Sequence, residues 1–187
     1  MERRKVAAVL GGGPSLPNDL KRLPQDCLLI SVNDHAFHFC KPDVLVHQDK
    51  LRNVYALQEV VKRFTGMVIS PHENSHVTLP PDAWRGDFSS SLATWFALWC
   101  DYQPVILCGM DCYQGKVKHC HPRPGVDYIA WHAPLVLHLR FWRQAFERCP
   151  HPERIRAMSG PLVQLFGRYE NELSTISDQR PTLVEMR

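Results

Sequence analysis

The chain has 187 residues, 44% of them hydrophobic, which suits one compact domain that folds without disulfides or metal. Its 22 basic and 19 acidic residues are mixed along the chain and leave a net charge of +3, so we expect no nucleic-acid partner, which would need a clustered basic face. No apolar run approaches the ~18 residues of a membrane span and no signal-peptide pattern is present, so we expect a cytoplasmic protein without a membrane span.

Six short apolar runs, rich in β-branched residues or leucine, are predicted to be strands. In chain order they are Val6–Leu10, Cys27–Val32, Asp43–His47, Met67–Ser70, Pro104–Cys108 and Arg154–Met158. Most of them lack the alternation of a half-exposed strand, which favours a parallel sheet covered on both faces. The expected fold class is therefore α/β, with a Rossmann-like, mostly parallel sheet and helices on both faces.

Three helices are predicted between these runs, over Leu51–Phe64, Leu92–Cys100 and Pro134–Arg148. Ser89, Ser90 or Ser91 can cap the second helix. The segment 114–131 is irregular, and we expect it to form a lid loop, because long connections in compact domains often do. We predict one domain over residues 1–168, which includes this lid, and a C-terminal tail over residues 169–187.

A glycine-rich loop directly follows the first strand, with Gly11, Gly12, Gly13, Pro14 and Ser15 in succession. Bare backbone at the carboxyl edge of a sheet can approach a ligand closely, and its amides and the Ser15 hydroxyl suit a phosphate. The loop lacks the third glycine of a dinucleotide fingerprint and the Gly-Lys-Ser/Thr of a P-loop. A tight turn that binds nothing is the alternative interpretation.

Polar residues also follow two other predicted strands. Asn33 and Asp34 end the second strand, and Gly109 and Asp111 follow the fifth. Carboxyl ends of parallel strands meet at one edge, so these residues are candidates to hold a ribose, a base or the loop itself, although polar residues often simply end strands in turns. Their joint position predicts a nucleotide pocket.

These stretches resemble bacterial family 42 sialyltransferases. The similarity is carried by "VLGGGPSL" near the start, by "SSSLATWFALWCDYQPVILCGMDCYQ" from Ser89 to Gln114, and more loosely by "DYIAWHAP" from Asp127 to Pro134. The Gly-Pro-Ser-Leu motif is also similar to related hydroxymethylpterin diphosphokinases and flagellin-modifying proteins.

The resemblance implies a metal-independent glycosyltransferase that passes sialic acid or a related sugar from a CMP-sugar to a carbohydrate acceptor, with no cofactor required. It implies that His132 removes the acceptor proton, and that Tyr113 hydrogen-bonds the departing phosphate. Such roles fit a neutral imidazole near pH 7 and a phenol facing developing charge. Together with the strand-end argument, the nucleotide-binding candidates are Gly11, Gly12, Gly13, Ser15, Asn33, Asp34, Ser89, Ser90, Ser91, Gly109 and Asp111.

Two other functions remain open at this point: a diphosphokinase-like pyrophosphoryl transfer that uses ATP and magnesium, and a nucleotide-binding module without catalysis. Self-association is also left open.

The odd number of cysteines, seven, is typical of reduced thiols rather than a disulfide framework. The densest group of soft ligands is Cys108, Cys112, His119, Cys120 and His121. We predict no metal site there, because the spacing is only a loose version of a structural zinc motif and Cys108 should point into the core.

Overall fold

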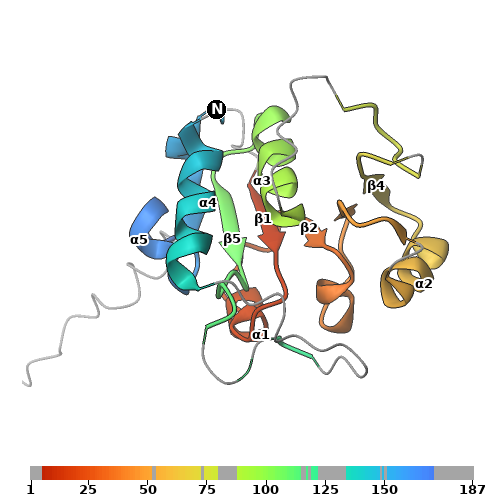
Figure 1. The fold of residues 1–187 in the computed structure, drawn as a ribbon, viewed down its shortest axis with the longest axis horizontal. Coiled ribbons are helices and arrows are strands. Elements are labelled where there is room, and N and C mark those ends of the chain that lie inside the picture. Colours follow the sequence, from red (N-terminus) through yellow and green to blue (C-terminus); the bar gives the residue numbers. More distant parts are fainter. Residues whose placement is uncertain are drawn as a thin grey trace, which may run out of the picture.

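The protein forms one six-stranded parallel sheet (Figure 1). In the computed structural model, the described residues are 6–51, 54–72, 74–79, 88–114, 117, 119–121, 134–147, 149 and 151–170. The strands are β1 (Ala7–Leu10), β2 (Leu28–Val32), β3 (Val44–Val46), β4 (Met67–Ile69), β5 (Val105–Cys108) and β6 (Ile155–Ala157). Their spatial order is β4-β3-β2-β1-β5-β6, and every neighbouring pair is parallel. This confirms the predicted fold class, and each strand lies within its predicted run.

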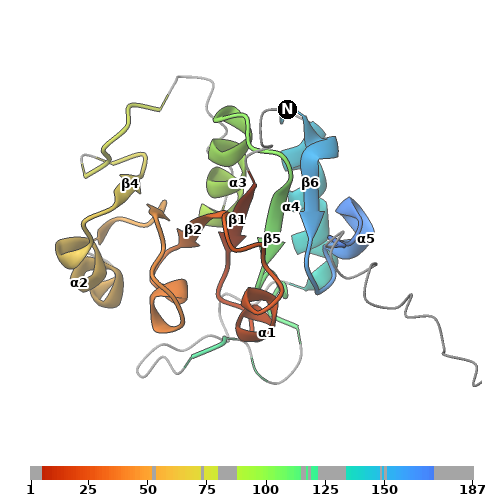
Figure 2. The same cartoon turned by 180° about the vertical axis from the view of Figure 1, so that it is seen from behind.

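Both faces of the sheet are covered, which explains the nearly continuous apolar runs. On one face Ala7 and Val9 pack with α3 (Ser89–Trp99), α4 (Leu135–Glu147) and α5 (Val163–Phe166). On the other face Ala8 and Leu10 pack with α1 (Leu16–Leu20) and the 3₁₀ helix η1 (His35–His38), while α2 (Tyr55–Arg63) covers β3 and β4. Figure 1 has α3 and α4 in front of the strands, and the reverse view of Figure 2 has the strands in front of these two helices.

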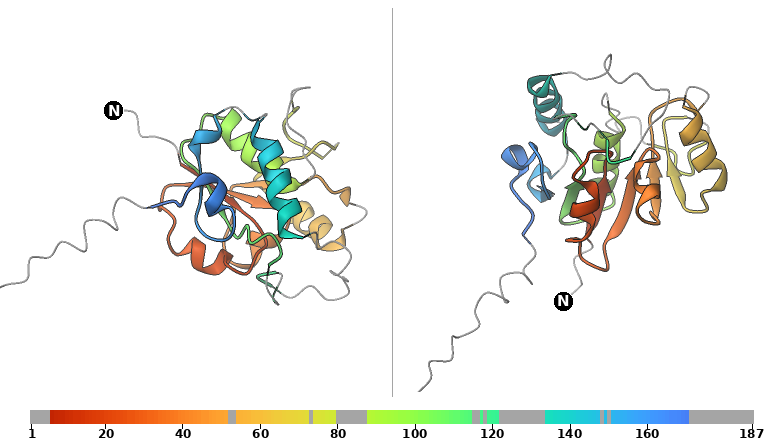
Figure 3. Two further views of the ribbon diagram at one scale, coloured as in Figure 1. Left: turned by 60° about the vertical axis from the view of Figure 1, so that its left-hand side comes forward. Right: turned by 90° about the horizontal axis from the view of Figure 1, so that it is seen from below.

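Helix α3 occupies the centre of its layer and packs against β1, β2, β3 and β5. Its side chains from Leu92 to Leu98 are all buried. The shorter helices α2 and α5 lie at opposite edges of the sheet (Figure 3). A 3₁₀ turn, η4 (Pro152–Arg154), leads into β6. Because α3 is buried on nearly all sides, it lies at the centre of the core on its side of the sheet.

The predicted serine cap of α3 is wrong. The helix already begins at Ser89, so the capping position falls on Phe88, and no side chain caps the helix. The Ser89 hydroxyl instead accepts a hydrogen bond from the backbone nitrogen of Gln48 (3.0 Å), and the Ser91 hydroxyl donates to the Phe88 carbonyl (2.6 Å). A contact with the neighbouring strand end therefore replaces the local cap.

Within the described residues, α4 places Trp142 in the core, and Leu135 and Leu139 pack against that core from the same helix. None of the helices in that part of the chain is long and apolar enough to cross a membrane. The predicted lid over 114–131 and tail over 169–187 fall mostly outside the described residues, so these boundaries stay predictions.

Candidate functional site

The sheet order places a topological switch point between β1 and β5. Strands β2, β3 and β4 follow β1 in one direction, whereas β5 and β6 lie on its other side. In open parallel sheets, ligands bind where the strand order reverses, outside the carboxyl ends of the strands. The two loops at this point are 11–15, after β1, and 109–113, after β5. The sequence-predicted glycine loop and the Gly-Met-Asp-Cys-Tyr segment are therefore neighbours.

The glycines of loop 11–15 allow close packing within the protein itself. A Cβ atom on Gly12 would lie 2.6 Å from the His35 ring. A Cβ atom on Gly13 would lie 2.1 Å from Asp111 Oδ2 and 2.7 Å from the Gly109 carbonyl oxygen. No side chain fits at either position without movement of its neighbours. The tight-turn interpretation thus explains part of the glycine pattern.

Most amides of loop 11–15 are already used inside the fold. Gly11 N donates to the Cys108 carbonyl and Gly13 N to the Gly109 carbonyl, both at 2.8 Å. Proline at position 14 has no amide hydrogen. The Gly12 amide, by contrast, donates to no acceptor among the described residues. It is the backbone donor that this loop can offer to an anion.

Two carboxylates hold the switch-point loops together. Asp111 Oδ2 accepts from both the backbone nitrogen (2.9 Å) and the hydroxyl (2.8 Å) of Ser15. Asp19 Oδ2 accepts from the Ser15 hydroxyl (3.1 Å), from Gly109 N (2.9 Å) and from the Ser159 hydroxyl (2.7 Å). Asp19 is only 2% exposed. Asp111 therefore braces the loop, which is one of the roles expected for it.

Asp19 was not among the sequence candidates. The available signal was its spacing of four residues from Ser15, which puts both on one side of a helical turn. That turn, α1, was not predicted, because five residues with a proline carry little periodicity.

Asn33 carries an uncommitted acceptor at the carboxyl end of β2. Its backbone has a positive φ of 53°, which Asn tolerates better than most residues. Its Nδ2 lies 3.4 Å from Asp49 Oδ2, while its Oδ1 is buried without a hydrogen-bond partner among the described residues. A buried acceptor without a partner costs free energy, so Oδ1 is suited to a donor on a ligand.

The three candidate serines start α3 near the end of β3. The hydrogen bond from Gln48 N fixes Ser89 beside the carboxyl end of that strand. The Ser90 carbonyl accepts from Thr94 Oγ1 (2.8 Å) inside the helix. The helix N-terminus thus lies at the same edge of the sheet as loop 11–15.

Tyr113 lies within an aromatic group formed with two histidines. Its ring is 5.3 Å from the His119 ring and 5.5 Å from the ring of His138, which is only 4% exposed. Like Asn33, Tyr113 has a positive φ, 55°. His132 lies outside the described residues, so its role as a base stays a prediction.

His47 directly follows β3, is completely buried and lies in a group of polar side chains. Its Nδ1 lies 2.9 Å from the Asp49 carbonyl oxygen, and its Nε2 lies 2.7 Å from Asn74 Nδ2. Burial lowers the pKa of His47, and the neighbouring His72 acts in the same direction, whereas the bond to Asp49 opposes the change. His47 is therefore held neutral near pH 7.

The cysteines of the soft-ligand group do not converge on a metal site. Cys108 is fully buried in the sheet, as predicted, and burial raises its pKa well above the usual value. Burial, helped by the Asp111 charge, raises the pKa of Cys112 to about 12. Cys120 packs on the opposite side of the sheet from Cys112. The thiols of Cys108 and Cys112 are therefore protonated packing groups at neutral pH.

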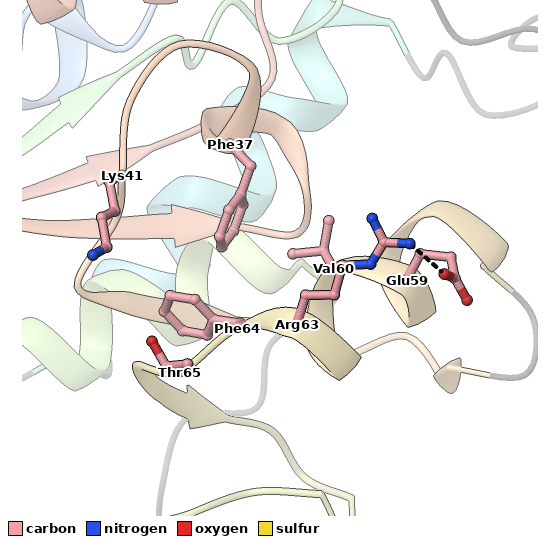
Figure 4. Close-up of a pocket in the computed structure, with 7 residues that line it drawn as sticks. All are labelled: Phe37, Lys41, Glu59, Val60, Arg63, Phe64 and Thr65. Atoms are coloured by element: carbon pink, nitrogen blue, oxygen red, sulfur yellow. Dashed lines mark hydrogen bonds and ion pairs between the residues drawn. The ribbon is translucent and has the colours of Figure 1, made fainter.

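A surface groove of about 360 Å³ lies between η1 and α2 (Figure 4). Phe37 and Phe64 meet edge to face in it, with ring centroids 5.2 Å apart, and Arg63 pairs with Glu59 at its rim. No residue of the switch-point loops lines this groove. It is therefore separate from the candidate nucleotide site.

The fold is a doubly wound, Rossmann-like α/β fold with its switch point between β1 and β5. The chain matches no protein-family model, and no curated protein matches its sequence.

Among solved structures, it is similar to the sialyltransferase CstII from Campylobacter jejuni in complex with cytidine 5′-monophosphate. The identity is 14%, the TM-score is 0.59, and the match covers 91% of this chain and 87% of that one. It is also similar to CstII in complex with a trisaccharide acceptor and CMP, at 13% identity and a TM-score of 0.57, covering 89% of this chain and 87% of that one. The monofunctional α-2,3-sialyltransferase Cst-I from C. jejuni matches at 13% identity and a TM-score of 0.51, covering 90% of this chain and 81% of that one. The protein thus has a sialyltransferase-like fold.

Proposed function

We propose that this protein is a glycosyltransferase of the family 42 type, which binds a CMP-sugar and transfers sialic acid or a related sugar to a carbohydrate hydroxyl. The observation that carries the proposal is that nearly the whole chain follows the fold of CstII, a sialyltransferase solved in complex with CMP. Two stretches that resemble this family, Gly-Pro-Ser-Leu and Gly-Met-Asp-Cys-Tyr, lie at the two loops of the switch point, where such folds bind ligands.

We assign some residues of the crevice to ligand binding and others to holding the shape of the loop. The Gly12 amide and Asn33 Oδ1 are the groups with capacity left for a ligand. We assign Gly12 to a phosphate oxygen and Asn33 to a hydroxyl or amino group of the nucleotide. Ser15 and Asp111 bond to each other, so we assign them to shaping the loop.

In the proposed reaction the acceptor oxygen attacks the anomeric carbon, the bond from that carbon to the phosphate oxygen breaks, and CMP departs. His132 takes the proton of the acceptor hydroxyl, and the Tyr113 hydroxyl donates a hydrogen bond to the departing phosphate. A positioned donor stabilises charge on that phosphate without a metal ion. For this step His132 has to be neutral and within hydrogen-bond distance of the acceptor hydroxyl.

Ligand binding is tested first, by thermal denaturation with CMP, CDP, UMP and ATP plus magnesium. At a hundredfold excess over its Kd, CMP should stabilise the fold by about 2.7 kcal/mol, a rise in Tm on the order of 5–10 °C for a chain of this size. UMP should give a smaller rise. A protein stabilised only by ATP plus magnesium, or by none of these ligands, contradicts the proposal.

Turnover of CMP-sialic acid, as hydrolysis or as transfer to a sugar, tests the chemistry. His132→Ala should lower kcat by roughly 10²–10⁴, and Tyr113→Phe by about 10², while both variants still bind CMP. The matched control is His151→Ala, because the His151 side chain is exposed and bonds to Glu153 on the η4 turn, away from the switch-point loops. Equal rates for wild type and His132→Ala would remove His132 from its role.

A further inference from the structure

A cluster of imidazoles lies beside the glycine loop, outside the residues assigned to the nucleotide. His35 and His38 come from η1, and His119 and His121 come from a segment far along the chain. The His38 and His121 rings stack with centroids only 3.9 Å apart, and His35 Nδ1 lies 3.0 Å from His121 Nε2. The His35 and His119 rings are 5.3 Å apart.

Three residues of this region have ligand atoms that lie close to one another. One atom each from Asp34, His38 and His121 lies within 4.8 Å of the other two. Asp34 is 2% exposed and His121 is 9% exposed, whereas His38 is on the surface. The donors are thus two imidazoles and a carboxylate, a set that suits zinc and its neighbours in the transition series.

We propose that Asp34, His38 and His121 bind one divalent transition-metal ion of the zinc class, with water in its remaining position. The predicted absence of a metal concerned a different set, which included Cys112 and Cys120. Neither cysteine belongs to the present group, in which Asp34 and His38 join His121 instead. Asp34, a nucleotide-binding candidate in the sequence, is assigned to this ion instead, and the ion has no step in the sugar transfer proposed above.

Binding of the ion requires the side chain of His38 to change its orientation. Zinc–nitrogen bonds of ~2.0–2.1 Å in a tetrahedron put ligand atoms about 3.4 Å apart. An imidazole binds a metal ion in its own ring plane, so the stacked His38 and His121 rings cannot both bind one ion as they stand. The exposed His38 side chain therefore has to rotate out of the stack, and the three ligand atoms, now within 4.8 Å of one another, have to close to that spacing. His35 already contacts His121, so it acts as the outer partner that orients a ligating imidazole.

Charge also favours a metal over a purely structural cluster. Two imidazoles stacked at 3.9 Å repel each other when both carry a proton. A metal ion binds imidazoles in their neutral form and adds the positive charge that the Asp34 carboxylate balances.

The ion would fasten the segment 119–121 to the edge of the sheet. In this segment Cys120 N donates to the Gly12 carbonyl (2.9 Å), and the Gly12 position packs against the His35 ring. The metal would thus hold one wall of the crevice next to loop 11–15. An effect of the bound ion on CMP affinity rests on the proposed function. Binding of the ion itself does not.

The test is titration of the full-length, chelator-treated protein with Zn²⁺ by calorimetry and with Co²⁺ by absorption spectroscopy. We expect one ion per chain, a higher Tm with Zn²⁺, and cobalt d–d bands without thiolate charge transfer. His38→Ala should weaken binding at least tenfold, and Asp34→Asn should do the same. His151→Ala and Cys120→Ser should bind as the wild type does. Far-UV circular dichroism establishes that each variant is folded.

Absence of binding, unchanged affinity in folded His38→Ala, or a cobalt–thiolate band that disappears in Cys120→Ser would each overturn the proposal. Binding of CMP is measured separately on the metal-free protein. Metal binding without CMP binding would refute the proposed function and support the metal site. CMP binding without metal binding would refute the metal site and support the proposed function.

Discussion

Replacing Asp19 by alanine tests whether one buried carboxylate holds the switch-point loops together. Its Oδ2 accepts hydrogen bonds from Gly109 N, the Ser159 hydroxyl and the Ser15 hydroxyl at 2.9, 2.7 and 3.1 Å. These donors come from three separate segments: the loop after β5, the segment after β6 and the loop after β1. Loss of the carboxylate therefore disconnects all three segments at one point.

The magnitude follows from the partners left behind. Ser15 retains its bond to Asp111, so it loses little. Gly109 is buried, and an unpaired buried amide costs about 1–3 kcal/mol. Ser159 is half-buried and can turn to water, so its loss is smaller. We expect Asp19→Ala to lower the free energy of unfolding by about 3 kcal/mol, and Tm by roughly 6–12 °C. Asp19→Asn keeps one acceptor and should cost about half as much.

The assay is urea denaturation followed by circular dichroism, with calorimetry for Tm. The matched control is Asp101→Asn, because the Asp101 side chain is 86% exposed and pairs with Arg154 at the surface. Such a pair contributes at most about 1 kcal/mol. A loss in Asp19→Ala no larger than that in Asp101→Asn would refute the reasoning that the three hydrogen bonds stabilise the loops.

Two further predictions concern the glycine loop and a buried histidine. Gly13→Ala should destabilise the fold by about 1–3 kcal/mol in urea denaturation, because the new Cβ would lie 2.7 Å from the Gly109 carbonyl oxygen, which cannot rotate away; a loss below about 0.5 kcal/mol contradicts the close packing. Burial lowers the pKa of His47, so below about pH 6.5 the unfolded chain takes up a proton that the folded protein refuses. Between pH 7.5 and 5.5 the free energy of unfolding of the wild type should therefore fall by up to about 1.4 kcal/mol more than that of His47→Gln. Parallel pH profiles of the two proteins would show that His47 does not contribute to the pH dependence of stability.

The strands and the class of fold were predictable because their signal is local. A run such as Ala7–Leu10 is apolar at every position, and only a strand covered on both faces accommodates that pattern. The glycine loop and Asp111 were also visible, because consecutive glycines and an acidic residue directly after apolar runs are local features of the chain. The three longer helices were found for the same reason, with ends within a few residues of those observed.

The parts that were missed depend on contacts across the fold. The serine cap of α3 failed because Ser89 bonds to Gln48 on the neighbouring strand end, which no local pattern encodes. Helix α1 and η1 span only five and four residues, too short for a periodic signal. Asp19 was missed as a consequence, although its Oδ2 alone joins three segments at the switch point.

The sequence alone determines that this protein is a parallel α/β domain with a glycine-rich turn after its first strand. Both features can be read from neighbouring residues, because a continuous apolar run indicates a strand buried on two faces and consecutive glycines indicate a tight turn. Only the tertiary structure decided that Gly13 is packed against Asp111 and that His121 meets His38. Residues far apart in the chain meet only when the order of the strands brings them to one edge, and that order is set by the packing of the whole sheet.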